Sequence, residues 1–152
     1  MVSLAGLTVL LWVGLVPELS AQVDRIDEES VKVQELLIDA SREKLLGHYD
    51  EAIKILESIL RKDRENATAA FELARIHEAT GDAEKSLKYA REATEYDDTN
   101  FWYFKFLASL QQQAGEYDAA AESYERVVAL QPNDAQSYYR YAFLLVKAHE
   151  IR

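Results

Sequence analysis

Residues 101–134 read FWYFKFLASLQQQAGEYDAAAESYERVVALQPND, and the pattern of this stretch recurs at a fixed distance along the chain. Glycines stand 34 residues apart at Gly47, Gly81 and Gly115. Three further columns share this spacing: Ala40, Ala74, Ala108 and Ala142; Ala52, Ser86 and Ala120; and Asn66, Asn100 and Asp134. Self-similarity at a period of about 20–50 residues indicates a repeat architecture, in which equivalent units stack along one direction.

Each column predicts a structural role. The glycines follow helical runs, where glycine adopts the left-handed conformation that ends a helix. Asn66, Asn100 and Asp134 precede the next helical run, where a short polar side chain caps free N–H groups. The alanine and small-residue columns predict helix faces that approach each other closely.

Apolar residues recur at helical spacing within each unit, and no stretch alternates with a period of two. The sequence therefore predicts an all-α fold without strands. The expected helices are residues 25–46, 50–62, 67–79, 83–95, 101–113, 117–130 and 135–149. With 49% hydrophobic and 29% charged residues, the composition is that of a globular domain.

The pattern resembles the tetratricopeptide repeat family. The third unit carries the resemblance best, through Phe104, Leu107-Ala108, Gly115-Glu116-Tyr117, Ala120, Tyr124 and Pro132. The resemblance implies a right-handed superhelix of antiparallel helix pairs, with about three and a half repeats. It divides the chain into a lead-in (22–32), repeats at 33–66, 67–100 and 101–134, and the first helix of a partial fourth repeat (135–152). The first repeat has a divergent first helix, with Asp39 and Glu43 at normally apolar positions.

The first 21 residues are predicted to be a signal peptide rather than part of the fold. Residues 3–16 carry no charge, and small residues lead to Ala21. The run is short for a membrane span, which needs about 20 apolar residues. We therefore expect an exported protein, in the periplasm or associated with a bacterial envelope. Because no Lys or Arg precedes the run, an uncleaved membrane anchor and an ordinary buried helix remain alternatives.

Residue types that carry chemistry are sparse. The chain has no cysteine, and His48, His77 and His149 lack the converging partners of a metal or catalytic site. We expect His77 to be a packing residue. A formal net charge of −10 argues against nucleic acid as a partner. The sequence thus predicts no enzyme, no cofactor, no metal and no small-molecule substrate.

The resemblance implies a concave groove lined by the first helix of each repeat, where partner segments bind. Its positions fall on seven candidate residues: Phe71, Arg75, Trp102, Lys105, Tyr139, Phe143 and Lys147. Ser109 and Gln112 lie at further groove positions. The alternative is that Phe71, Trp102 and Phe143 pack between neighbouring helices. Chaperone-binding relatives clamp a carboxylate with Lys and Asn residues. Here the matching positions are Leu37, Ser41, Glu72, Trp102 and Phe106, so we do not expect that clamp.

We expect a non-enzymatic scaffold that binds another protein or a peptide segment with apolar and acidic side chains. The alternative is an N-terminal sensory or adaptor module of a longer protein whose activity lies beyond Arg152. The last helix contains an unbroken apolar run, Phe143–Val146. It predicts an exposed face that is covered by self-association or by further repeats.

Overall fold

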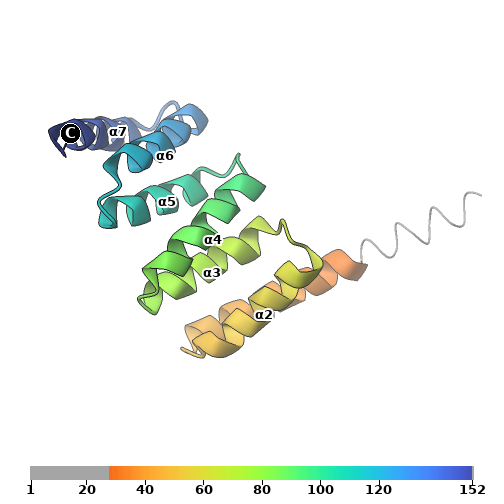
Figure 1. Cartoon of the computed structure of the whole chain (residues 1–152). Coiled ribbons are helices and arrows are strands. Elements are labelled where there is room, and N and C mark those ends of the chain that lie inside the picture. Colours follow the sequence, from red (N-terminus) through yellow and green to blue (C-terminus); the bar gives the residue numbers. More distant parts are fainter. Residues whose placement is uncertain (1–27, 152) are drawn as a thin grey trace, which may run out of the picture.

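The computed structural model describes residues 28–151, and this part of the chain contains seven helices and no strand (Figure 1). A first helix occupies residues 28–45. It is followed by α2 (Tyr49–Lys62), α3 (Ala67–Ala79), α4 (Ala83–Tyr96), α5 (Phe101–Gln113), α6 (Tyr117–Leu130) and α7 (Ala135–Ile151). The predicted signal peptide, residues 1–21, lies outside the described residues.

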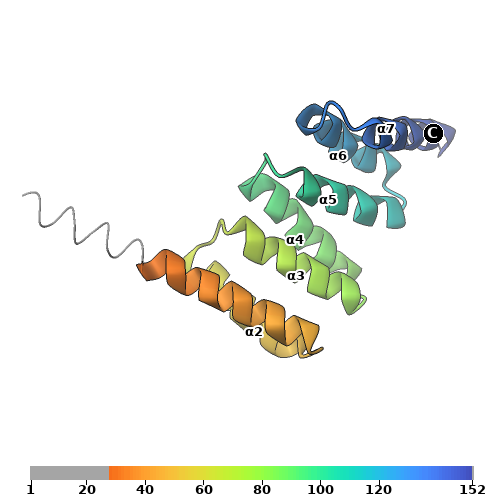
Figure 2. The ribbon, with the colours of Figure 1, turned by 180° about the vertical axis from the view of Figure 1, so that it is seen from behind.

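The helices form antiparallel pairs that stack into a solenoid, from the first helix at one end to α7 at the other (Figures 1 and 2). Within a repeat, α3 packs on α4 and α5 packs on α6. Neighbouring repeats are joined by contacts between α2 and α3, α4 and α5, and α6 and α7. The expected all-α solenoid of about three and a half repeats is confirmed.

The three glycines end the first helices of the repeats as predicted. Gly47, Gly81 and Gly115 have φ values of 80°, 80° and 78°, a region that residues with a side chain rarely adopt. The following residue then closes the turn, as where Asp82 N donates to the His77 carbonyl at 2.8 Å. A Cβ added to any of the three would meet no atom within 4 Å, so backbone conformation rather than packing requires glycine here.

The polar column caps the helix starts. Asn66 Oδ1 accepts a hydrogen bond from Ala69 N at 2.9 Å. Asn100 Oδ1 accepts from Trp102 N at 3.1 Å, and Asp134 Oδ1 accepts from Gln136 N at 3.2 Å. All three positions therefore satisfy backbone donors that the first turn of a helix leaves free.

The small-residue columns lie at helix crossings, with one exception. Ala40, Ala74, Ala108, Ala52, Ser86 and Ala120 are all buried. Between α3 and α4 the approach is close enough for Ser86 Oγ to donate to the Ala74 carbonyl at 2.9 Å. Ala142 differs, because it is exposed. In the described chain no second helix packs on its side of α7.

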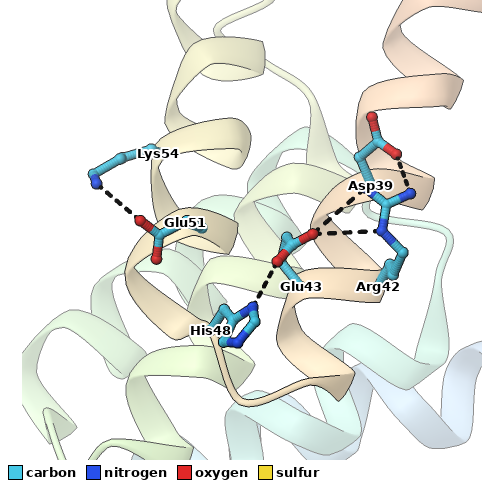
Figure 3. A network of polar contacts seen from close by, with 6 residues as sticks. All are labelled: Asp39, Arg42, Glu43, His48, Glu51 and Lys54. Atoms are coloured by element: carbon cyan, nitrogen blue, oxygen red, sulfur yellow. Dashed lines mark hydrogen bonds and ion pairs between the residues drawn. The ribbon is translucent and has the colours of Figure 1, made fainter.

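The divergent first repeat uses its unusual acids in surface ion pairs (Figure 3). Asp39 pairs with Arg42 at 2.9 Å, and Glu43 contacts both Arg42 and His48 Nδ1, the latter at 2.9 Å. The contact with His48 lowers the pKa of Glu43. Lys54 and Glu51 on α2 form a further exposed pair at 3.3 Å. Such exposed pairs stabilise a fold only slightly.

No helix among residues 28–151 has the length and apolar character needed to cross a membrane.

Candidate partner-binding surface

On α3, the two candidate residues contact each other and are engaged by neighbours. The Phe71 ring lies 4.6 Å from the Tyr103 ring and 5.3 Å from the Phe106 ring, both on α5. The Arg75 guanidinium lies 5.8 Å from the Phe71 ring centre. It also pairs with Glu72 at 3.2 Å. Phe71 therefore links two neighbouring first helices, while the charge of Arg75 is met within its own helix.

On α5, Trp102 is open to solvent and Lys105 is not free. The Trp102 side chain is 61% exposed. Lys105 Nζ lies 5.5 Å from the Trp102 ring centre and pairs with Asp134 Oδ2 at 3.0 Å. Hydrogen bonds from Ser137 and Lys105 lower the pKa of Asp134 to about 2. The Lys105–Asp134 pair thus ties α5 to the start of α7.

On α7, the candidates are accessible and pair with none of the others. Tyr139 is 73% exposed and Phe143 is 37% exposed. Lys147 pairs with Glu150 at 2.7 Å, a bond that raises the pKa of Lys147. Within residues 28–151, no ring contact, hydrogen bond or ion pair joins these three residues to the four candidates on α3 and α5. A single surface shared by all seven stays a prediction.

A cleft of about 400 Å³ lies where α5, α6 and α7 meet. Trp102, Lys105, Ser109 and Gln112 line it from α5, Tyr124 lines it from α6, and Gln136, Ser137 and Arg140 line it from α7. Four groove positions predicted on α5 therefore share one cavity.

Sequence reasoning missed Arg140, the cation on the α7 side of this cleft. Its side chain is exposed and forms no ion pair or hydrogen bond in the described part of the chain. The side chains of Gln112 and Gln136 are likewise without hydrogen bonds there. The repeat period offers a clue, because Arg140 stands 34 residues after Phe106 and 68 after Glu72. The cleft thus combines an open indole ring, two amides and a guanidinium available to a ligand.

Histidines and acids of the described helices take part in packing and ion pairs. Among residues 28–151, no three His, Asp or Glu side chains are placed to hold a metal ion. His77 is buried with its ring stacked on Tyr89 at 5.6 Å. Burial lowers the pKa of His77, while Asp82 at 3.7 Å partly opposes this. His77 is thus a packing residue, as expected.

Solved structures with this fold come from several kinds of protein. The MamA protein matches with a TM-score of 0.65 at 20% identity, over 74% of this chain and 61% of the MamA chain. The first tetratricopeptide domain of Spaghetti (RPAP3), bound to the HSP90 peptide SRMEEVD, matches with a TM-score of 0.66 at 16% identity. That match covers 77% of this chain and 93% of the RPAP3 domain.

The Thermobaculum terrenum O-GlcNAc transferase matches with a TM-score of 0.63 at 17% identity. The match covers 76% of this chain and 22% of the transferase chain. At these identities the likeness shows the shared fold alone. A search of curated proteins found no match.

Two family profiles, both described as tetratricopeptide repeat, match residues 45–110 and 104–136. Together they span residues 45–136, which include helices α2 to α6. The three glycine turns and the three polar caps lie within this range, whereas most of the first helix lies before it. Tetratricopeptide repeats are modules of protein–protein interaction, and this chain belongs to the tetratricopeptide repeat family.

Proposed function

We propose that this protein is a non-enzymatic scaffold that binds a segment of another protein in the cleft between α5 and α7. The observation that supports this most directly is the cleft itself, where Trp102 is exposed beside polar side chains that have no partner in the described chain. Tryptophan and arginine are the residues most often found at the energetic centre of protein interfaces. The RPAP3 domain, which has the same fold, was solved with a bound peptide.

The chemistry of the cleft favours an extended segment with an apolar side chain next to an acidic one. The apolar side chain would pack on the Trp102 indole, and the amides of Gln112 and Gln136 would bond the peptide backbone. The acid would pair with Arg140, whose planar guanidinium suits a carboxylate. Lys105 is a weaker candidate for this role, because Asp134 already holds it at 3.0 Å.

A phage-displayed library of random twelve-residue peptides tests the proposal. We expect the protein to enrich peptides that pair an apolar with an acidic residue. A chain of net charge −10 would attract basic peptides non-specifically, so enrichment of acids requires a local cation. Trp102→Ala should weaken binding of a selected peptide by about 2 kcal/mol, roughly 30-fold. Tyr138→Ala, an exposed aromatic outside the cleft lining, serves as the matched control.

A double-mutant cycle then tests whether the acidic residue of the peptide pairs with Arg140. Wild type should prefer a peptide with Glu over its Gln analogue, and Arg140→Gln should bind the two equally. Arg64→Gln, another exposed arginine, should keep the preference. If the library yields no peptide, or if Trp102→Ala binds as wild type does, the scaffold proposal in this cleft is wrong.

For the location of the protein, we propose export to the periplasm or envelope, supported by the uncharged run at residues 3–16. N-terminal sequencing of the protein from a fractionated bacterial host should find Gln22 as the first residue. An intact N-terminus in the membrane fraction would favour the anchor, and an intact one in the cytosol would contradict export.

A second candidate function is an adaptor module of a longer protein. It is favoured by the O-GlcNAc transferase, in which the segment that matches this chain makes up 22% of an enzyme's chain. The exposed side chains of Leu145 and Val146 on α7 offer a face on which further repeats could pack. Sequencing the coding region on both sides of this segment would decide between the two.

A further inference from the structure

The first helix, residues 28–45, carries an exposed apolar stripe that the proposed cleft does not use. We define the stripe as Val31, Ile38 and Leu45, which are 52%, 66% and 84% exposed. They stand seven residues apart, and seven residues make almost two helical turns, so all three lie on one side of the helix. The stripe spans 14 residues, about 21 Å of helix.

The register of the solenoid shows what this side of a first helix normally contacts. Ile38 occupies the same column as Glu72 on α3 and Phe106 on α5. Glu72 pairs with Lys44 on the preceding first helix, and Phe106 packs on Phe71 of the preceding first helix. In later repeats this side is thus covered by another first helix. The first helix lies at the end of the stack (orange in Figure 2), and the described part of the chain places no helix over its exposed stripe.

We infer that the stripe pairs with the same stripe of a second copy, in an antiparallel arrangement with Ile38 at the twofold axis. The spacing is symmetric about Ile38, because Val31 precedes it by seven residues and Leu45 follows it by seven. An antiparallel pair therefore places Val31 of each copy against Leu45 of the other, and the two Ile38 side chains against each other. Such self-complementarity is what a twofold interface requires.

The charges beside the stripe agree with this pairing. Glu35 and Arg42 lie on the same flank, one turn before and one turn after Ile38. In the antiparallel pair, Glu35 of each copy faces Arg42 of the other, which makes two opposite-charge contacts. Glu35 has no ion pair in the described chain. Arg42, with a side chain that is 60% exposed, bonds Asp39 and Glu43 and retains open donors (Figure 3). The opposite flank holds Gln34 and Ser41, so no like charges meet there.

Sedimentation velocity of the full chain, Met1 to Arg152, tests the dimer. Three apolar layers make a small interface, so we expect a dissociation constant on the order of 10 µM. Ile38→Asp places two carboxylates against each other at the axis and should leave a monomer at all concentrations studied. Because Ile38 is largely exposed, the variant should keep wild-type helicity by circular dichroism. Leu145→Asp, at the other end of the solenoid, is the matched control and should remain dimeric.

Disulfide mapping tests the antiparallel geometry. Because the chain has no native cysteine, only the introduced cysteines can form disulfides. Ile38→Cys should cross-link two copies on mild oxidation, because its Cα atoms meet at the axis. Leu45→Cys alone should not cross-link, because the Leu45 positions of the two copies lie at opposite ends of the antiparallel pair. The double variant Val31→Cys with Leu45→Cys should cross-link, because position 31 of one copy faces position 45 of the other. Efficient cross-linking of Leu45→Cys alone would indicate a parallel pair and overturn the inference.

A charge exchange gives the last readout. Glu35→Arg should weaken the dimer about three- to tenfold, and Glu35→Arg with Arg42→Glu should restore it. A wild-type protein that stays monomeric overturns the inference. This is the result expected if residues 1–27, rather than a second copy, cover the stripe. A dimer that survives Ile38→Asp also overturns it, because association then occurs through another surface.

Discussion

Ala74 gives the sharpest test of the helix packing, because the substitution Ala74→Leu has a matched control in the same column. Ala74 is fully buried in a cluster with Ala90, Leu107 and Leu110. Leucine adds three carbon atoms where the structure leaves no room. Overpacking of this kind costs about 1–3 kcal/mol. If α3 and α4 separate to accept the side chain, the hydrogen bond from Ser86 Oγ to the Ala74 carbonyl is lost as well, which adds about 1 kcal/mol.

We therefore expect Ala74→Leu to lower the free energy of unfolding by about 2–4 kcal/mol. For a domain of this size, that lowers the melting temperature by roughly 6–15 °C, measured by circular dichroism. The control is Ala142→Leu, in the same repeat column but exposed on α7, which should melt within about 2 °C of wild type. If both variants lose the same stability, or neither does, burial at a helix crossing is not what selects alanine in this column.

Three further outcomes follow from local contacts. Asn100→Ala removes the acceptor for Trp102 N and should cost about 1 kcal/mol, while Asn133→Ala, next to a cap but exposed, should cost almost nothing. His77 has a lowered pKa in the folded state, so its contribution to stability is complete above about pH 6.5 and is lost as the pH falls. Urea unfolding of His77→Phe should show a weaker loss between pH 7 and pH 5 than wild type. The Asp134 pKa of about 2 means that its contribution is present above about pH 4 and disappears towards pH 2. Asp134→Asn should thus be less stable at pH 7 and lose less on acidification, and parallel acid curves would contradict this.

The helix boundaries could be predicted closely because they are encoded locally. The structure has α3, α5 and α6 at the predicted residues, begins α2 one residue earlier, and ends α4 one residue and α7 two residues later. The starts of α3 and α5 are capped by Asn66 and Asn100, and the first helix of each complete repeat ends at a glycine with positive φ. These signals act within a few residues, so a single sequence contains them in full.

The ion pairing of the candidate cations could not be predicted in the same way, because it depends on a contact distant in sequence for Lys105 and on the choice of rotamer for Arg75 and Lys147. The sequence identified Lys105 as a groove cation, but its partner Asp134 lies 29 residues away. Arg75 and Lys147 are each engaged by an acid one turn away on the same helix. Helical spacing permits such pairs without requiring them, since an exposed side chain chooses among several rotamers. The unpaired cation of the cleft, Arg140, became apparent only once α5 and α7 were placed on the two sides of that cleft.

One column of the repeat explains why the fold was easier to derive than the function. Columns of glycine, alanine and capping residues keep the same chemistry through the three complete repeats, because each performs the same structural task there. The column of Ile38, Glu72, Phe106 and Arg140 instead has a different residue type each time, although all four occupy the same position of a first helix. Glu72, Phe106 and Arg140 lie on the side that faces the preceding first helix, and no described helix precedes that of Ile38. Glu72 forms an ion pair there and Phe106 an aromatic contact, whereas Ile38 and Arg140 are left exposed. Substitutions at the two exposed positions, Ile38 and Arg140, should therefore change what the protein binds much more than how stably it folds. Arg140→Ile should alter peptide selection and leave the melting temperature within about 2 °C of wild type, and a large loss of stability would show that this position serves packing instead.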